Sequence, residues 1–151
     1  MTSPRDRDAL GRAENARPRD GLGRPLPRGS TGVERVEARE RSVAEALDEA
    51  QDYLDREMPF HAHEVLEEQW KATTGPERPL WQGLAQLAVG LTHQRRGNAR
   101  GATTVTTRGA DAIAPFAEEA PHGIDVAGLV TWARALAAHP DDEVPVPALR
   151  S

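Results

Sequence analysis

The residues with the clearest chemical character lie in one short stretch, from Phe60 to Trp70. His63 and Glu67 are four residues apart, so on an α-helix their side chains share one face and can reach a single ligand. Imidazole nitrogen and carboxylate oxygen are both common ligands of divalent metal ions. We therefore expect either a metal site or a buried hydrogen-bonded pair here, with Glu64 as the candidate general base if the pocket is catalytic.

This stretch has the pattern of a helix at about residues 59–73, because Pro59 suits the first helical turn and no glycine interrupts it. One face gathers aromatic and aliphatic residues around the polar pair, which predicts a core-facing stripe. The stripe contains Phe60, His63, Leu66, Glu67 and Trp70, and its two aromatic residues would line the pocket. A buried polar group without a partner costs about 1–3 kcal/mol, so His63 and Glu67 require partners. The same helical wheel points His61 towards solvent.

A second predicted helix begins at residue 79 or 80, ends at about residue 96, and is apolar nearly all round, which is typical of a central buried helix. Opposite its leucine ridge, Gln82, Gln86 and His93 follow one line. Because a short turn separates this helix from the preceding one, the two are expected to pack antiparallel. The line would then face the polar pair, with His93 as a third metal ligand and the glutamines and Trp70 around it.

The spacing differs from the zinc-protease pattern His-Glu-x-x-His, because Glu67 stands where the second histidine belongs. We therefore reject a metalloprotease. Three interpretations of the cluster stay open, and the third, after the two that follow, is direct catalysis by these side chains without a metal ion. In the first, a divalent metal ion held by His63, Glu67 and His93 activates water for hydrolysis. In the second, the cluster is a structural hydrogen-bond network inside a non-enzymatic helical interaction module.

The rest of the chain predicts three further helices, at about residues 33–56, 99–113 and 126–138. The first carries a narrow apolar stripe on an otherwise charged surface, and this stripe would suit a homodimer interface. Asn98 and Asp125 are expected to cap the other two. The sequence therefore predicts an all-α fold, a compact multihelical bundle of about five helices around an antiparallel central pair.

Composition divides the 151-residue chain into one domain and two tails. Residues 1–31 hold seven arginines, four acidic residues, four prolines and four glycines, with few apolar residues. This composition predicts a disordered tail with a net charge of +3. Residues 32–139 are predicted to form a single helical domain. Residues 140–151, which contain three prolines, are predicted to be a disordered C-terminal tail.

Charge and composition also limit the classes of partner. Outside the first 31 residues, 12 basic residues stand against 20 acidic ones, which argues against nucleic acid as a partner. The chain has no cysteine, which excludes disulfides and thiolate chemistry. No apolar run approaches a length of about 18 residues, and no signal-peptide pattern begins the chain. We therefore expect a cytoplasmic protein without a membrane partner, whose partner is an unidentified protein or small molecule.

Several short motifs together resemble one known family. They are Phe60-x-x-His63-Glu64-x-x-Glu67-x-x-Trp70, Gln82-Gly83-Leu84-x-Gln86-x-Ala88, His93, Gly97-Asn98-x-x-Gly101-Ala102 and Gly123-Ile124-Asp125. Over about residues 43–138 the chain is similar to the bacterial and archaeal domain-of-unknown-function family number 309, whose hallmark is His-x3-Glu-x2-Trp or Tyr. The resemblance implies an all-helical fold and metal binding by the motif that His63, Glu67 and Trp70 form here. It implies no reaction and no substrate.

Overall fold

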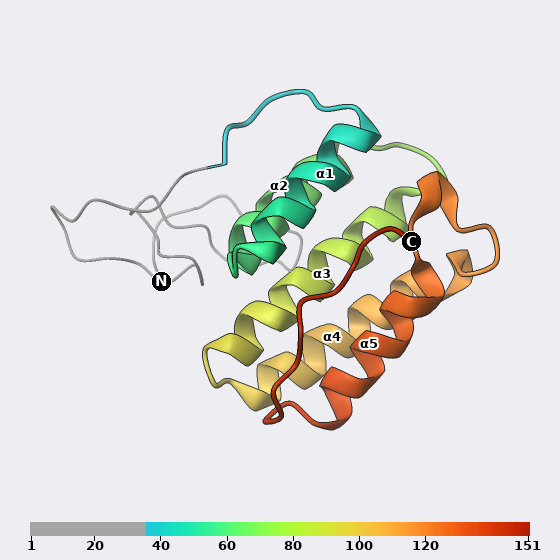
Figure 1. Cartoon of the computed structure of the whole chain (residues 1–151). Helices are drawn as coiled ribbons and strands as arrows, with labels where there is room; N and C mark the ends of the chain where they lie inside the picture. Colours follow the sequence, from blue (N-terminus) through green and yellow to red (C-terminus); the bar gives the residue numbers. More distant parts are fainter. Residues whose placement is uncertain (1–35) are drawn as a thin grey trace, which may run out of the picture.

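The computed structural model describes residues 36–151, which form five α-helices and two short 3₁₀ turns (Figure 1). The elements are α1 (Val43–Asp55), α2 (Pro59–Ala72), α3 (Arg78–Arg95), α4 (Ala99–Ile113), η1 (Ala114–Phe116), η2 (Pro121–Gly123) and α5 (Val126–Ala138). Within these residues no β-strand is formed, and the predicted all-α class is confirmed. No helix in this range is both long and apolar enough to cross a bilayer. The predicted tail at residues 1–31 lies outside the described residues.

The ends of α2 to α5 lie within two residues of the predicted ends, because local signals in the sequence set them. The side chain of Asn98 accepts a hydrogen bond from the Gly101 N–H at 3.0 Å, and Asp125 accepts one from the Gly128 N–H at 3.2 Å. Both are N-caps, which satisfy amides that lack a partner in the first helical turn. Between α3 and α4, Gly97 adopts the left-handed conformation (φ 78°) that stops a helix.

The structure corrects the start of the first predicted helix. α1 begins at Val43, and residues 36–42 are not helical. Ser42 and Glu45 form a capping box in which the Glu45 N–H donates to Ser42 Oγ at 3.1 Å and the Ser42 N–H donates to Glu45 Oε1 at 2.9 Å. The backbone hydrogen bond from Ser42 lowers the pKa of Glu45. This reciprocal cap is a strong helix start, so the charged residues before it remain outside the helix.

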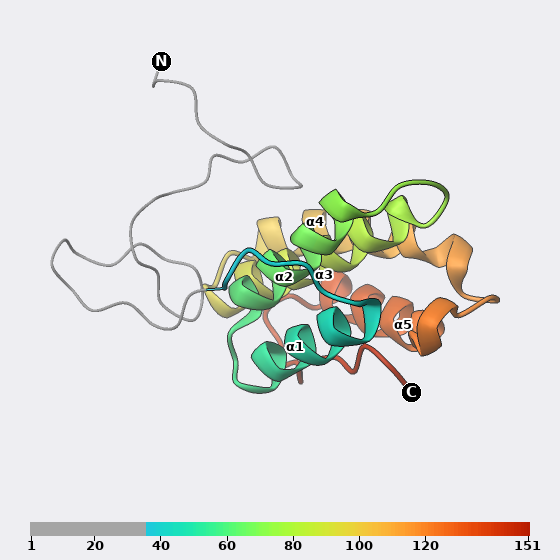
Figure 2. The same cartoon turned by 90° about the horizontal axis from the view of Figure 1, so that it is seen from above.

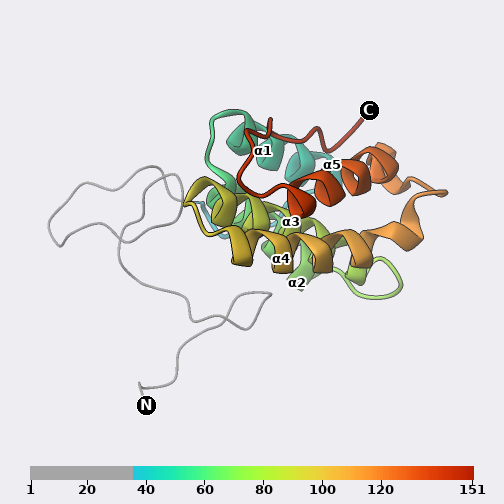
Figure 3. The same cartoon turned by 90° about the horizontal axis from the view of Figure 1, so that it is seen from below.

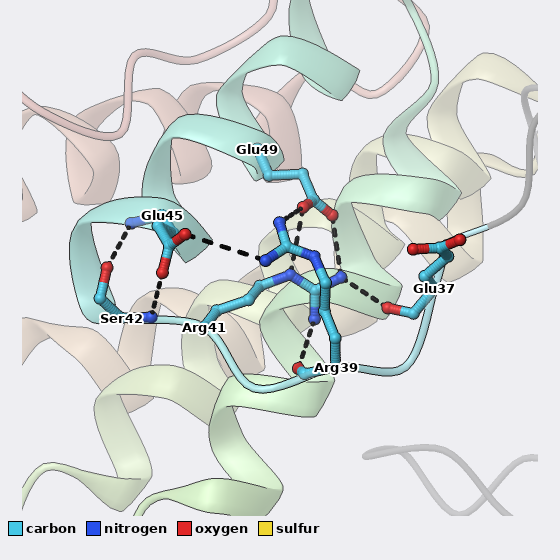
Figure 4. Close-up of polar contacts among 6 residues, drawn as sticks. All are labelled: Glu37, Arg39, Arg41, Ser42, Glu45 and Glu49. Carbon is cyan, nitrogen blue, oxygen red and sulfur yellow. Dashed lines mark hydrogen bonds and ion pairs between the residues drawn. The ribbon is translucent and has the colours of Figure 1, made fainter.

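An ion-pair cluster fixes residues 36–42 against α1 (Figure 4). Arg41 donates to Glu49 Oε2 at 2.9 Å and to the Glu37 carbonyl oxygen at 2.7 Å, and its side chain is only 2% exposed. Arg39 donates to Glu49 Oε1 at 2.7 Å. Burial raises the pKa of Glu49, but the hydrogen bonds from Arg41 and Arg39 outweigh burial, and the pKa lies below its ordinary value. The charged form of Glu49 therefore holds this segment in place.

α3 is the central helix, as its apolar surface predicts. Each helix packs against the next helix along the chain, and α1 and α5 lie on one side of α3 while α2 and α4 lie on the other (Figures 2 and 3). The leucine ridge of α3 is buried and consists of Leu80, Leu84, Leu87 and Leu91. At the end of α3, Arg95 donates to Glu57, just before α2, at 2.8 Å. The start of α2 therefore lies beside the end of α3, and the predicted antiparallel pair is confirmed.

Glycines bring α3 and α4 unusually close together. A Cβ added at Gly90 would lie 1.9 Å from the hydroxyl oxygen of Thr106, and one added at Gly83 would lie 2.6 Å from a methyl carbon of Ile113. Such distances are far below van der Waals contact, so a larger residue at either position would force the helices apart.

The predicted disordered tail at residues 140–151 is the second correction. Here residues 140–151 lie between α1 and α5, across α3 (Figure 3). Leu149 is 3% exposed, and its carbonyl oxygen accepts a hydrogen bond from the Asp125 N–H at 2.8 Å. The prolines suggested disorder, but an extended segment needs no helical propensity when distant side chains satisfy its backbone.

Candidate functional site

The predicted polar pair forms on α2 and is buried. His63 Nε2 lies 3.0 Å from Glu67 Oε2, and the two side chains are 2% and 5% exposed. The other oxygen, Glu67 Oε1, lies 3.2 Å from Lys71 Nζ. His63, Glu67 and Lys71 follow one another at intervals of four residues, and we name them the α2 polar line.

The α2 polar line explains how a carboxylate is tolerated inside the bundle. Desolvating a charge is costly unless partners compensate it, and both oxygens of Glu67 have one on their own helix. Lys71 also lies in the last turn of α2, where a cation is favoured by the helix dipole. Lys71 is not among the residues predicted for the site, although a glutamate followed by a lysine four residues later is a recognisable stabilising pair.

The two aromatic residues of the motif have different neighbours. The Phe60 ring lies beside the His63 ring, with 5.1 Å between ring centroids and an angle of 52°. Trp70 is half-buried, and the guanidinium of Arg78 lies over its ring at 4.4 Å. This distance is typical of a cation–π contact. Phe60 therefore lines the polar pair, while Trp70 joins the end of α2 to the start of α3.

The three predicted residues of α3 are half-buried: Gln82, Gln86 and His93. His93 lies at the turn into α4, where Asn98 Nδ2 donates to its ring nitrogen Nδ1 at 3.1 Å. An accepting Nδ1 means that the proton of the neutral ring is on Nε2. His93 therefore takes part in closing the α3–α4 turn.

The predicted set of metal ligands does not come together as a three-residue centre. Within residues 36–151, no group of three or more histidine, aspartate or glutamate side chains is arranged to hold a metal ion. His63 and Glu67 are paired with each other, and His93 bonds Asn98. Glu64, the candidate base, is half-buried on the same helix.

His61 corrects the prediction that it faces solvent. It is 3% exposed, and its ring lies 5.3 Å from the ring of Tyr53 on α1. The prediction from the helical wheel holds only if a single face of α2 is covered by other helices. Because α1 packs on one side of α2 and α3 on another, two faces are covered, and each contains a buried histidine.

The fold and the site together define a small all-α domain whose second helix carries a buried His–Glu pair. Residues 47–105 match the family model described as Domain of unknown function (DUF309), so this part of the chain is similar to that family, and the resemblance seen in its motifs is confirmed. One relative, the Uncharacterized protein YpuF from Bacillus subtilis (strain 168), is 45% identical over 58 residues, 33% of this chain and 33% of that protein. This chain therefore matches about a third of the length of that curated relative. No solved structure matches the chain.

The matched residues cover one part of the molecule. They include the α2 polar line and His93, and they end inside α4. α5 and residues 140–151 lie outside the match. The family resemblance therefore bears on α2 and α3, whereas the C-terminal region must be interpreted from its own contacts.

Proposed function

We propose that this protein is a non-enzymatic helical interaction module, in which the α2 polar line is a structural network. The observation that carries the proposal is the pairing of both Glu67 oxygens, one with His63 and one with Lys71. A ligand at this carboxylate would have to displace a partner that stabilises its buried charge. The network then serves to keep a charged carboxylate paired on the buried side of α2.

The metal interpretation implied by the family resemblance is the competing proposal. It is supported by the 3.0 Å separation of His63 Nε2 and Glu67 Oε2, because two such atoms could chelate one divalent ion. Catalytic zinc sites use three protein ligands, and within residues 36–151 no group of three histidine, aspartate or glutamate side chains is arranged to hold a metal ion. The residues therefore do not fit a catalytic metal centre, and we derive no hydrolytic step and no role for Glu64 as a base.

Metal analysis of the full chain, purified without an affinity tag or chelator, separates the two proposals. We expect less than about 0.1 equivalent of divalent metal, and no stoichiometric uptake of added Zn²⁺ or Mn²⁺, as judged by calorimetry. His63→Ala tests the pair, and His139→Ala, at an exposed histidine, is the matched control. Near-stoichiometric metal that is lost in His63→Ala and kept in His139→Ala would overturn the structural network.

The predicted homodimer stays a proposal. Light scattering coupled to size-exclusion chromatography measures the mass directly. A mass near twice the 16.4 kDa of one chain would support self-association. A single-chain mass at high concentration would contradict it and leave a different protein as the partner.

A further inference from the structure

Residues 140–151, which we name the C-terminal segment, are held largely through their backbone. Gln94 of α3 donates from its side-chain amide to two carbonyl oxygens near the start of the segment, at 3.2 and 2.8 Å. Trp132 of α5 donates from its indole nitrogen to the Pro145 carbonyl oxygen at 2.8 Å. Contacts of this kind recognise an extended backbone and place few demands on its side chains.

Gln51 of α1 forms hydrogen bonds with the segment on both sides of Ala148. The side-chain amide of Gln51 donates to the Pro147 carbonyl oxygen at 3.0 Å, and its oxygen accepts from the Leu149 N–H at 2.8 Å. A single amide group therefore satisfies an acceptor and a donor of the same extended chain. Gln51 is fixed in turn by a hydrogen bond to Asp55 at 2.9 Å.

The end of the segment pairs with the body as a short strand would. Ile124 and Arg150 form an isolated antiparallel β-bridge, and the Asp125 N–H donates to the Leu149 carbonyl oxygen at 2.8 Å. The β-bridge, the two Gln51 hydrogen bonds and the Trp132 indole hydrogen bond are main-chain contacts. Proteins bind extended peptides through contacts of this kind.

The C-terminal segment lies along a line between α1 and α5, which we name the seam. Two side chains of the segment show which kind of peptide the seam prefers. Leu149 is the apolar anchor, since it is 3% exposed, and Arg150 pairs with Asp48 of α1. Beside them lies a hollow of about 430 Å³ that Asp52 and Asp55 also line. Arg150 pairs with Asp48 and Arg56 pairs with Asp52, while Asp55 accepts a hydrogen bond from Gln51, so the three aspartates of this edge exceed its two paired arginines by one negative charge.

We propose that the seam between α1 and α5 binds an extended peptide from another protein, one that presents a leucine followed by basic residues. The C-terminal segment is then its tethered competitor, which keeps the seam occupied until such a peptide displaces it. The charge complementarity favours this partner, because a further basic residue would meet Asp55, the aspartate of this edge that neither Arg150 nor Arg56 pairs with. This inference rests on the proposed interaction module and names its binding surface and partner chemistry.

Displacement can be measured in the full chain with one substitution. Because the sequence contains no cysteine, Ser151→Cys carries a nitroxide label at a single, exposed position. The probe is a synthetic peptide with the sequence of residues 144–151 followed by two arginines, and the control peptide has aspartate in place of its leucine. We expect the probe to raise the mobile fraction of the electron paramagnetic resonance signal in a saturable manner. A signal that is unchanged, or equally changed by the control peptide, would overturn the proposal.

A direct binding measurement gives a second readout. Leu149→Ala weakens the tethered competitor, so a fluorescent probe peptide should bind this variant about tenfold more tightly than the wild type, because apparent affinity scales with the open fraction. Adding Gln51→Ala should abolish the gain. Circular dichroism checks that the variants are folded. If they are not, the displacement measurement with the label at Ser151→Cys tests the proposal. Equal affinity for wild type and Leu149→Ala would count against the competitor role.

Two further results separate this inference from its alternatives. A wild-type dimer that becomes monomeric in Leu149→Ala would identify a second copy's C-terminal segment as the occupant and would overturn the choice of another protein. Metal uptake at His63 reports on α2 alone, whereas displacement reports on α1 and the C-terminal segment. A failure of the proposed function and a failure of this inference can therefore be told apart.

Discussion

The α2 polar line and the C-terminal segment satisfy their polar groups in opposite ways. His63 and Glu67 are four residues apart on one helix, and Lys71 follows after four more. The backbone N–H of Leu149 donates a hydrogen bond to the side chain of Gln51, which lies 98 residues earlier in the chain. The first arrangement exists as soon as α2 forms, whereas the second requires the whole bundle. Stability measurements on variants can therefore distinguish the two regions.

Removing the shared carboxylate is expected to have the largest effect. Glu67→Ala takes away the partner of both His63 and Lys71, and losing one member of a buried pair costs about 3 kcal/mol. Urea unfolding measures this loss. Glu68→Ala, at the half-buried neighbour, is the control and should change the free energy of unfolding by less than about 0.5 kcal/mol. Similar values for the two variants would mean that the α2 polar line does not stabilise the fold.

The anchor of the C-terminal segment should rank second. Leu149→Ala removes a buried leucine side chain and should cost about 2 kcal/mol, at the lower end for such substitutions because the segment can readjust. Val146→Ala, at a half-buried valine of the same segment, is the control and should cost less. Thermal unfolding compares the two variants. An unchanged midpoint in Leu149→Ala would show that the segment contributes nothing to the stability of the bundle.

The two Gln51 hydrogen bonds should contribute less to the free energy of unfolding than the buried Leu149 side chain. Gln51→Ala removes the hydrogen bonds to Pro147 and Leu149, with an expected net loss of about 1 kcal/mol. Hydrogen exchange should show faster exchange of the Leu149 amide, while amides in the middle of α2 keep their rates. If α2 loosens as much as the segment does, the two regions are not independent.

The smallest effect is expected at Glu49, whose partners lie 8 and 10 residues away. Its folded pKa is lowered, so its ion pairs stabilise the protein above the ordinary value of 4.5 and are lost as the pH falls through the folded pKa. Glu49→Gln should cost under about 1 kcal/mol at neutral pH. The difference from wild type should disappear in acid, and Glu40→Gln is the exposed control. A difference that is constant with pH would exclude the charged form as the cause.

The same contrast explains what the sequence could predict. Helical periodicity and caps located α2 to α5, and the i, i+4 spacing located His63 and Glu67, because these signals lie within a few residues of one another. The Ser42–Glu45 capping box marks the start of α1 in the sequence, whereas the longer apolar pattern, which begins at Val36, favours an earlier start. The burial of His61 depends on Tyr53 of another helix, which a wheel drawn for one helix does not include.

The C-terminal segment was beyond sequence reasoning for a physical reason. Its composition is that of a tail, and its order depends on side-chain amides such as Gln51 and Gln94, whose neighbours in space are not their neighbours in sequence. His93 gives the opposite lesson. Its place on the polar side of α3 was predicted, but a nearby asparagine was the partner that the turn supplied.

The close approach of α3 and α4 has a consequence for how the protein opens. Gly90 against Thr106 and Gly83 against Ile113 leave no room between these two helices for a water molecule or an added methyl group. Transient opening should therefore begin at the outer layer, where α1 and the C-terminal segment can detach without disturbing this contact. The α3–α4 pair would be the last part to separate and the part least tolerant of substitution.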